Sequence, residues 1–141
     1  MGKKRIVKSG ASKETSARVS AKASKKKVAE GILYVEATFN NTKVSLTDRK
    51  GNVLFWSSSG SLGFKGAKKG TPFAAAKVGD LIGEKAEAIG VKEADVVVKG
   101  VGTGRESAIR SFMARGIELT SIKDKTPVPF NGPKPKKPRR V

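Results

Sequence analysis

The chain has 141 residues, a length that fits one domain. Its 30 Lys and Arg residues against 12 Asp and Glu residues give a formal net charge of +18, and it contains no cysteine and no histidine. These absences exclude disulfides, Cys/His zinc sites, thiol nucleophiles and imidazole bases. No apolar run approaches the roughly 20 residues of a membrane span. The basic N-terminal stretch lacks the apolar core of a secretion signal.

The positive charge is concentrated at the two ends of the chain. Residues 1–27 have a net charge of +9 and residues 123–141 a net charge of +6. Neither end has enough apolar surface to offset the entropy of ordering it. We therefore expect a basic arm over 1–27, a globular α/β RNA-binding domain over 28–124 and a Pro/Lys/Arg-rich arm over 125–141. This distribution favours nucleic acid as the partner, because an anionic membrane requires bulky apolar residues beside the lysines.

Three alternating segments predict an antiparallel meander of strands over 31–39, 43–48 and 53–58. The alternation places Phe39 on the buried face of the first strand. Trp56 could stack on a base, but we expect it to be buried by sheet packing.

The second half of the chain predicts strand–helix–strand crossovers. The expected elements are a helix over 72–89 capped by Thr71, a strand over 94–99, a helix over 105–115 with Met113 facing inward, and a strand over 117–123. The order β-β-β-α-β-α-β predicts a five-stranded mixed sheet with helices packed on it. Gly79 and Gly83, four residues apart, are expected to permit close packing of the first helix on the sheet, with simple tolerance of glycine in the helix as the alternative.

The loop from Ser57 to Thr71 is the strongest internal binding signal. Glycines let a backbone approach a phosphate closely, and serines, lysines and a helix start supply donors. We expect a phosphate cradle, with a flexible connector as the alternative, and no nucleotide P-loop, because the GxxxxGK[ST] pattern is absent. The candidate residues are Ser57, Ser58, Ser59, Gly63, Lys65, Gly66, Lys68, Lys69 and Thr71.

A second glycine turn precedes the second helix, with Gly102, Gly104 and Arg105 as candidate phosphate-binding residues. The alternative is a tight turn demanded by packing. Arg110 could also serve a phosphate, and Glu106 could instead neutralise either arginine.

Three strand carboxylates, Glu36, Asp48 and Asp95, could hold magnesium for phosphoryl chemistry. We expect them to be ordinary exposed strand and turn residues. The sequence therefore predicts no catalytic residue, no metal site and no cofactor.

The C-terminal arm is extended by its prolines, so that its cations can follow a phosphate chain. Asn131 and Gly132 form a turn pair prone to cyclise, because glycine does not block attack of its nitrogen on the Asn side chain. The candidate cations are Lys134, Lys136, Lys137, Arg139 and Arg140. At the other end, Lys25, Lys26 and Lys27 are expected to neutralise phosphates.

Several short motifs occur in a fixed order along the chain and together indicate a family. They are Phe39-Asn40-Asn41-Thr42, Thr47-Asp48, Trp56-Ser57-Ser58, Gly63-Phe64-Lys65-Gly66, Lys68-Lys69, Thr71-Pro72-Phe73-Ala74-Ala75, Gly102-Thr103-Gly104-Arg105-Glu106, Thr126-Pro127, Asn131-Gly132 and Arg139-Arg140-Val141. In this the chain resembles the universal small-subunit ribosomal protein eleven family of the bacterial type, over about residues 28–141. The resemblance adds Asn40 and Asn41 to the candidate RNA-binding residues.

The resemblance implies a ribonuclease-H-like fold without catalytic activity. It implies a structural constituent of the small ribosomal subunit that bridges helices of its ribosomal RNA at the platform, near the messenger exit path and the Shine–Dalgarno cleft. The implied neighbours are ribosomal proteins seven and eighteen, initiation factor three and nearby messenger RNA, without membrane or small-molecule substrate.

The resemblance places the chain in cytoplasmic ribosomes or in those of a bacterial-type organelle, with an isoaspartate expected at Asn131. A metal-dependent nuclease and a free RNA chaperone are the alternatives.

Overall fold

The computed structural model describes residues 27–140. Its elements are β1 (Glu30–Ala37), β2 (Thr42–Asp48), β3 (Val53–Ser58), the 3-10 helix η1 (Gly66–Gly70), α2 (Pro72–Ile89), β4 (Glu93–Lys99), α3 (Arg105–Met113) and β5 (Glu118–Asp124). Every strand and both predicted helices are present in the expected order. The Lys25 and Lys26 predictions, and most of the N-terminal arm, lie outside the described residues.

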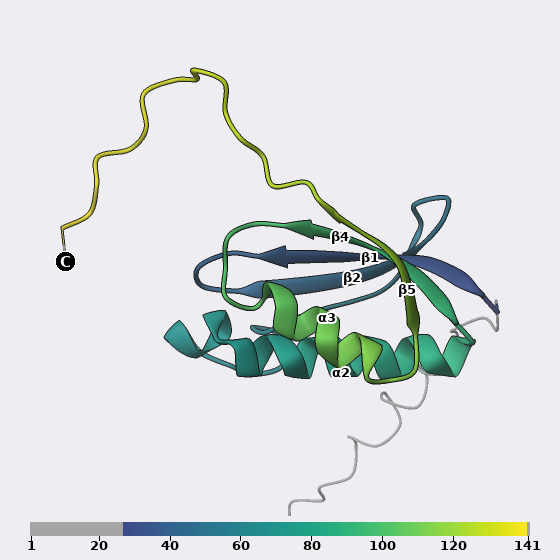
Figure 1. Cartoon of the computed structure of the whole chain (residues 1–141). Helices are drawn as coiled ribbons and strands as arrows, with labels where there is room; N and C mark the ends of the chain where they lie inside the picture. Colours follow the sequence, from purple (N-terminus) through teal and green to yellow (C-terminus); the bar gives the residue numbers. More distant parts are fainter. Residues whose placement is uncertain (1–26, 141) are drawn as a thin grey trace, which may run out of the picture.

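The strands form one mixed sheet in the order β3-β2-β1-β4-β5. β1 pairs antiparallel with β2, and β2 with β3, whereas β4 lies parallel to both β1 and β5. The parallel pairs need long crossovers, which α2 and α3 supply. This confirms the five-stranded mixed sheet with its two crossover helices. Figure 1 shows both helices against one face of the sheet, and no helix of residues 27–140 covers the other.

The core lies between the helices and that face. Its side chains come from alternate positions of β1, β2 and β4 and from the inward stripes of the helices. They include Leu33, Val35, Val44, Leu46, Val78, Ile82, Val96, Ala108 and Phe112. Within the described chain, no helix has the length and apolar character needed to cross a bilayer.

The first helix begins and ends where the sequence predicts. The Thr71 side chain accepts a hydrogen bond from the Ala74 N–H at 3.4 Å, and Pro72 follows at the first helical position. Gly90 ends the helix with φ 87°, a left-handed conformation that glycine adopts without steric cost.

Three side chains that the sequence predicts to be buried, two aromatic rings and one methionine, are exposed instead. Phe39 is 79% exposed because β1 ends at Ala37 and a turn closed by Thr38 and Asn41 follows. Trp56 is 58% exposed because α2 and α3 both lie on the other face of the sheet. Met113 is 47% exposed because it is the last residue of α3, beside the edge strand β5.

Gly79 and Gly83 permit close packing, but against α3 rather than the sheet. A Cβ added at Gly79 would clash with the backbone oxygen of Ala108. One added at Gly83 would come within 2.8 Å of the Arg115 side chain. The predicted close approach at these glycines was correct. The predicted neighbour, the sheet, was wrong, because the periodicity of one helix does not reveal which element packs against each face.

Candidate nucleic-acid interface

Three loops that are far apart in the sequence meet at one end of the sheet. They are the β1–β2 turn at residues 38–41, the loop from Ser57 to Thr71, and the glycine turn at residues 100–104. The Asn41 side-chain oxygen accepts a hydrogen bond from Gly60 N–H at 3.3 Å. The Thr103 hydroxyl donates to the Gly70 carbonyl at 2.8 Å. We call this assembly the loop cluster.

The serines of the loop cluster are engaged in holding its shape. Ser57 and Ser59 are buried, and the Ser59 N–H donates to the Thr42 carbonyl at 2.9 Å. Ser58 and Ser61 bond to one another, with the Ser58 N–H donating to the Ser61 hydroxyl at 2.9 Å. The loop is therefore an ordered unit within the described chain, and its buried hydroxyls are not displayed to a ligand.

Two glycines of the loop leave its backbone open. Gly63 and Gly66 have φ of 97° and 62°, and a Cβ added to either would meet no atom within 4 Å. Their glycine identity follows from backbone conformation. The empty space beside them is compatible with a closely approaching phosphate.

Three lysines and a helix start add positive charge to this end of the molecule. Lys65 and Lys68 are exposed and Lys69 is half-buried, all ahead of the first turn of α2. Among residues 27–140, none of the three lies within 4.0 Å of an acidic side chain. The N-terminal end of α2 carries the positive end of the helix dipole, so this surface attracts anions.

The second glycine turn serves packing. A Cβ at Gly102 would clash with the Thr38 carbonyl, and one at Gly104 with the Thr42 side chain. Both glycines are buried, so the alternative of a packing-demanded turn accounts for them. Their place in the loop cluster is against β1 and β2, not at its surface.

Arg105 is held by protein groups in this structure. Its guanidinium donates to the Gly100 carbonyl and to the Asp124 carboxylate, the latter at 2.7 Å. Hydrogen bonds from Thr126, together with the Arg105 ion pair, hold the pKa of Asp124 well below its usual value. Asp124 therefore neutralises Arg105, and Glu106 lies 3.7 Å from Arg110, which confirms the alternative that Glu106 neutralises one of the two arginines.

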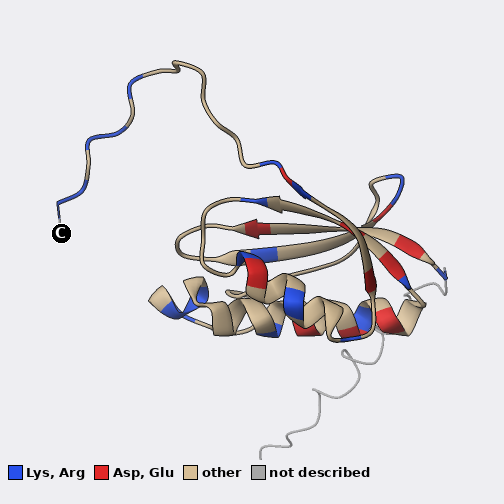
Figure 2. Cartoon of the chain, viewed as in Figure 1, with Lys and Arg blue, Asp and Glu red and all other residues tan. Residues whose placement is uncertain are grey.

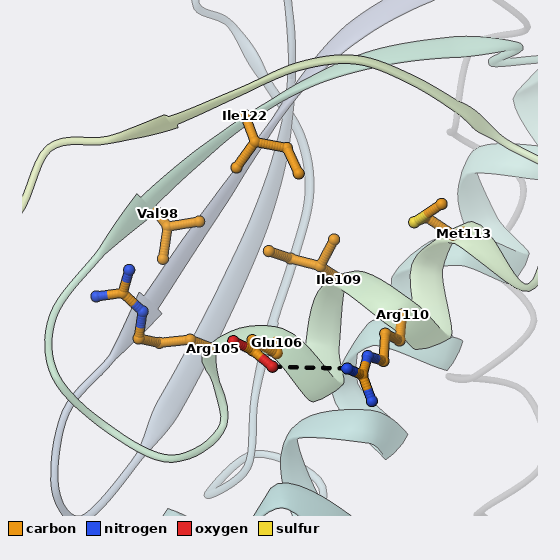
Figure 3. A pocket seen from close by; sticks show the side chains of 7 residues that line it. All are labelled: Val98, Arg105, Glu106, Ile109, Arg110, Met113 and Ile122. Atoms are coloured by element: carbon orange, nitrogen blue, oxygen red, sulfur yellow. Dashed lines mark ion pairs between the residues drawn. The ribbon is translucent and has the colours of Figure 1, made fainter.

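A groove beside this turn lies along α3. Figure 3 shows Val98, Ile109, Met113 and Ile122 as its apolar lining, with the Glu106–Arg110 ion pair at its mouth. Because Arg105 and Arg110 each face a carboxylate, the groove offers no uncompensated pair of cations to a phosphate.

The C-terminal arm leaves the sheet as an extended, exposed segment. Residues 125–140 contain no helix or strand, and all but Thr126 are exposed. Figure 2 shows Lys and Arg along the arm and acid only near its base. Asn131 is the one non-glycine residue of the described chain with positive φ, at 47°. All seven candidate residues of the arm, from Asn131 to Arg140, are therefore available to a partner.

The three strand carboxylates do not form a metal site. Glu36 pairs in register with Lys43, whereas Asp48 pairs with Gly31, roughly 16 Å further along β1 at 3.3 Å per residue. Asp48 accepts hydrogen bonds from Asn52, which lower its pKa, and Asp95 accepts from the Ser121 hydroxyl at 2.7 Å. Within residues 27–140, no three metal-ligating side chains gather.

Sequence reasoning missed the lysines on the helix-free face of the sheet. Lys43 on β2 and Lys99 on β4 occupy strand positions that alternate with buried residues, and both are exposed. Lys123 on the edge strand β5 is also exposed, and its register partner Val97 places it on the same face. The same alternation that predicted the core could have placed them on the opposite face.

Comparison with known proteins identifies the family of this chain. The family model described as ribosomal protein S11 matches residues 31–140, most of the chain. This chain belongs to the ribosomal protein S11 family. It is a protein of the small ribosomal subunit, and ribosomal RNA is the partner that fits its charge.

Individual relatives agree with the S11 assignment. The small ribosomal subunit protein uS11 of Thermotoga maritima is 51% identical over 111 residues, which cover 79% of this chain and 85% of that protein. The uS11 of Treponema pallidum strain Nichols is 54% identical over 117 residues, covering 83% and 93%. The family is one of structural ribosomal proteins, which disfavours the nuclease alternative.

Proposed function

We propose that this S11-family chain binds and bridges helices of the small-subunit ribosomal RNA at the platform, near the messenger exit path and the Shine–Dalgarno cleft. The loop cluster contacts one stretch of sugar-phosphate backbone, and the basic arms, 1–27 and 125–141, thread between helices around the domain 28–124. The single observation that carries this is the exposed pair Lys65 and Lys68, which has no acidic partner among the described residues.

Membership in the S11 family further supports neighbours of the platform. On this basis we expect contacts with ribosomal proteins seven and eighteen, proximity to messenger RNA and initiation factor three, and a place in cytoplasmic or organellar ribosomes. Co-sedimentation with small subunits at high salt separates this assembled component from a free RNA chaperone, which would be removed by the wash.

The loop cluster is tested by neutralising its lysines. The triple variant Lys65→Gln, Lys68→Gln, Lys69→Gln is compared with wild type for binding to a helical fragment of small-subunit ribosomal RNA over a range of salt. Each lysine that contacts a phosphate contributes about 1 to the slope of log affinity against log salt. We expect the slope to fall by about 2 to 3.

The matched control removes charge at the other end of the sheet. Lys50→Gln with Lys92→Gln changes two exposed lysines, in the β2–β3 turn and just before β4. These should leave the slope close to wild type. Equal effects of the two variants would mean that binding depends on net charge alone, and the loop cluster would then not be a site.

The arm contributes a second proposal, that Asn131 isomerises. It is exposed, has positive φ and is followed by Gly132, whose missing side chain leaves its nitrogen free to attack. Peptide mapping with an isoaspartyl methyltransferase should label the wild-type tail after ageing and leave Gly132→Ala unlabelled. Equal labelling of the two would contradict it.

A further inference from the structure

The helix-free face of the sheet carries an exposed aromatic row that the proposed function leaves unused. Trp56 on β3 pairs in register with Ser45 on β2, and Ser45 pairs with Tyr34 on β1. Cross-strand partners lie on the same face, so both rings are on the side away from α2 and α3. Trp56 is 58% exposed and Tyr34 is 40% exposed.

The spacing of the row suits flat ligands. Neighbouring strands lie about 4.8 Å apart, so Trp56 and Tyr34 are separated by roughly 10 Å across β2. The small side chain of Ser45 stands between them. In the next row on this face, Val53 is 59% exposed and Ile32 is half-buried. Ser45 and Thr47 of β2 lie between the two apolar pairs, and Asp95 on β4 continues the row of Ile32.

Positive charge borders the aromatic row on one side. Register places Lys43, Glu36 and Lys99 in the adjacent row, and Lys123 at the β5 end of the aromatic row itself. Glu36 lies 3.9 Å from Lys99 and partly compensates it, whereas Lys43 and Lys123 have no acidic side chain within 4.0 Å among residues 27–140. The positive charge of this border favours an anionic partner over a protein surface without excess negative charge.

This lysine border continues into the loop cluster. Lys43 pairs with Ser58, which opens the loop, and Lys99 directly precedes Gly100 of the glycine turn. Lys43 and Lys99 therefore lie at the end of the helix-free face that adjoins the loop cluster.

We propose that the helix-free face binds unpaired nucleotides of RNA. Two bases stack on Trp56 and Tyr34, and the phosphates that join them lie along Lys43, Lys99 and Lys123. Open sheets that recognise single-stranded RNA combine exposed aromatic rings with nearby cations in this way. The inference rests on the proposed function for its RNA partner, but it uses none of the loop-cluster residues.

Trp56 is the only tryptophan of the chain, so its fluorescence reports directly on stacking. The full-length protein is titrated with a single-stranded oligoadenylate of about 8 nucleotides. Quenching of Trp56 emission is the expected result. An abasic strand of equal length and charge should bind without quenching, because it offers phosphates but no bases. Unchanged emission at saturating oligoadenylate would overturn the proposal.

Variants then measure the contribution of each ring, with affinity followed by anisotropy of a labelled oligoadenylate. Trp56→Leu and Tyr34→Leu should each weaken binding about tenfold, within the range for loss of one stacked base. Trp56→Phe should retain most of the affinity, since a phenyl ring still stacks. The matched control is Phe73→Leu, a ring 65% exposed on α2. An equal loss of affinity in this control would show that the aromatic row is not a specific stacking site.

Two comparisons separate this inference from the proposed function. The Lys65/Lys68/Lys69 variant should lose affinity for helical ribosomal RNA while oligoadenylate still quenches Trp56. In assembled small subunits, ultraviolet light should crosslink Tyr34 or Trp56 to a nucleotide. A crosslink to protein alone would show that a neighbouring protein occupies the face, and the inference would be wrong.

Discussion

The substitution Gly79→Ala tests how closely α2 and α3 pack. In an exposed helix, replacing Gly with Ala stabilises by about 1 kcal/mol. Here the added Cβ would clash with the backbone oxygen of Ala108, which cannot rotate away as a side chain can. Overpacking of this kind costs about 1 to 3 kcal/mol, and a backbone obstacle belongs at the upper end. The net expectation is destabilisation by about 2 kcal/mol.

Urea denaturation followed by far-ultraviolet circular dichroism measures this change, provided that the m-value stays constant. In thermal unfolding the same loss corresponds to a decrease in Tm of about 8 °C. The matched control is Gly83→Ala, one turn later on the same helix. Its Cβ would meet the flexible Arg115 side chain at 2.8 Å and 3.3 Å, and Phe112 oxygen only at 3.5 Å. Rotation of Arg115 can move its Cγ but not its Cβ, and it disturbs the ion pair with Asp80, so this clash is only partly relieved. We expect Gly83→Ala to be close to neutral, within about 1 kcal/mol of wild type, and clearly less destabilising than Gly79→Ala. If both variants gained stability equally, helix propensity would dominate and the packing argument would be refuted.

Three further predictions concern other parts of the structure. Phe112→Ala should destabilise by about 3 to 5 kcal/mol in the same denaturation assay, because Phe112 is fully buried between α3 and the sheet; a loss below about 1 kcal/mol would mean that the site collapses around the cavity. Thr71→Ala should cost about 1 kcal/mol and Thr71→Ser should not, because the hydroxyl accepts from the first turn of α2. The folded-state pKa of Asp124 is lowered from 3.8. The ionised carboxylate therefore contributes to the stability of the fold above pH 3.8, and this contribution is lost as the pH falls through the lowered value. The Tm advantage of wild type over Asp124→Asn should therefore shrink on acidification from about pH 5 to pH 2, and a constant difference would contradict the linkage.

Several features of the site could be read from local sequence. Thr71 before Pro72 marks a helix start wherever the chain folds, because capping involves only neighbouring residues. The lysines at 65, 68 and 69 stand out as a cluster for the same reason. Both features were predicted, and both lie in the described loop cluster.

Other features depended on partners that are distant in the sequence. Arg105 was predicted to face phosphate, but it pairs with Asp124, which strand β5 brings beside the glycine turn. Ser59 was predicted to contact a phosphate, but it is fully buried, and its N–H donates to the Thr42 carbonyl. Phe39 continues the alternation of β1 beyond Ala37, where the turn has already carried it out of the sheet.

The sequence by itself determined the order and type of the elements and the concentration of positive charge at the ends. Periodicity, caps and charge runs are properties of neighbouring residues, so they can be read without knowing the fold. Only the tertiary structure decided that both helices cover the same face, that three separate loops form one cluster, and that Trp56 and Tyr34 share an open row. These facts depend on strand order and register, which are set by packing between segments distant along the chain.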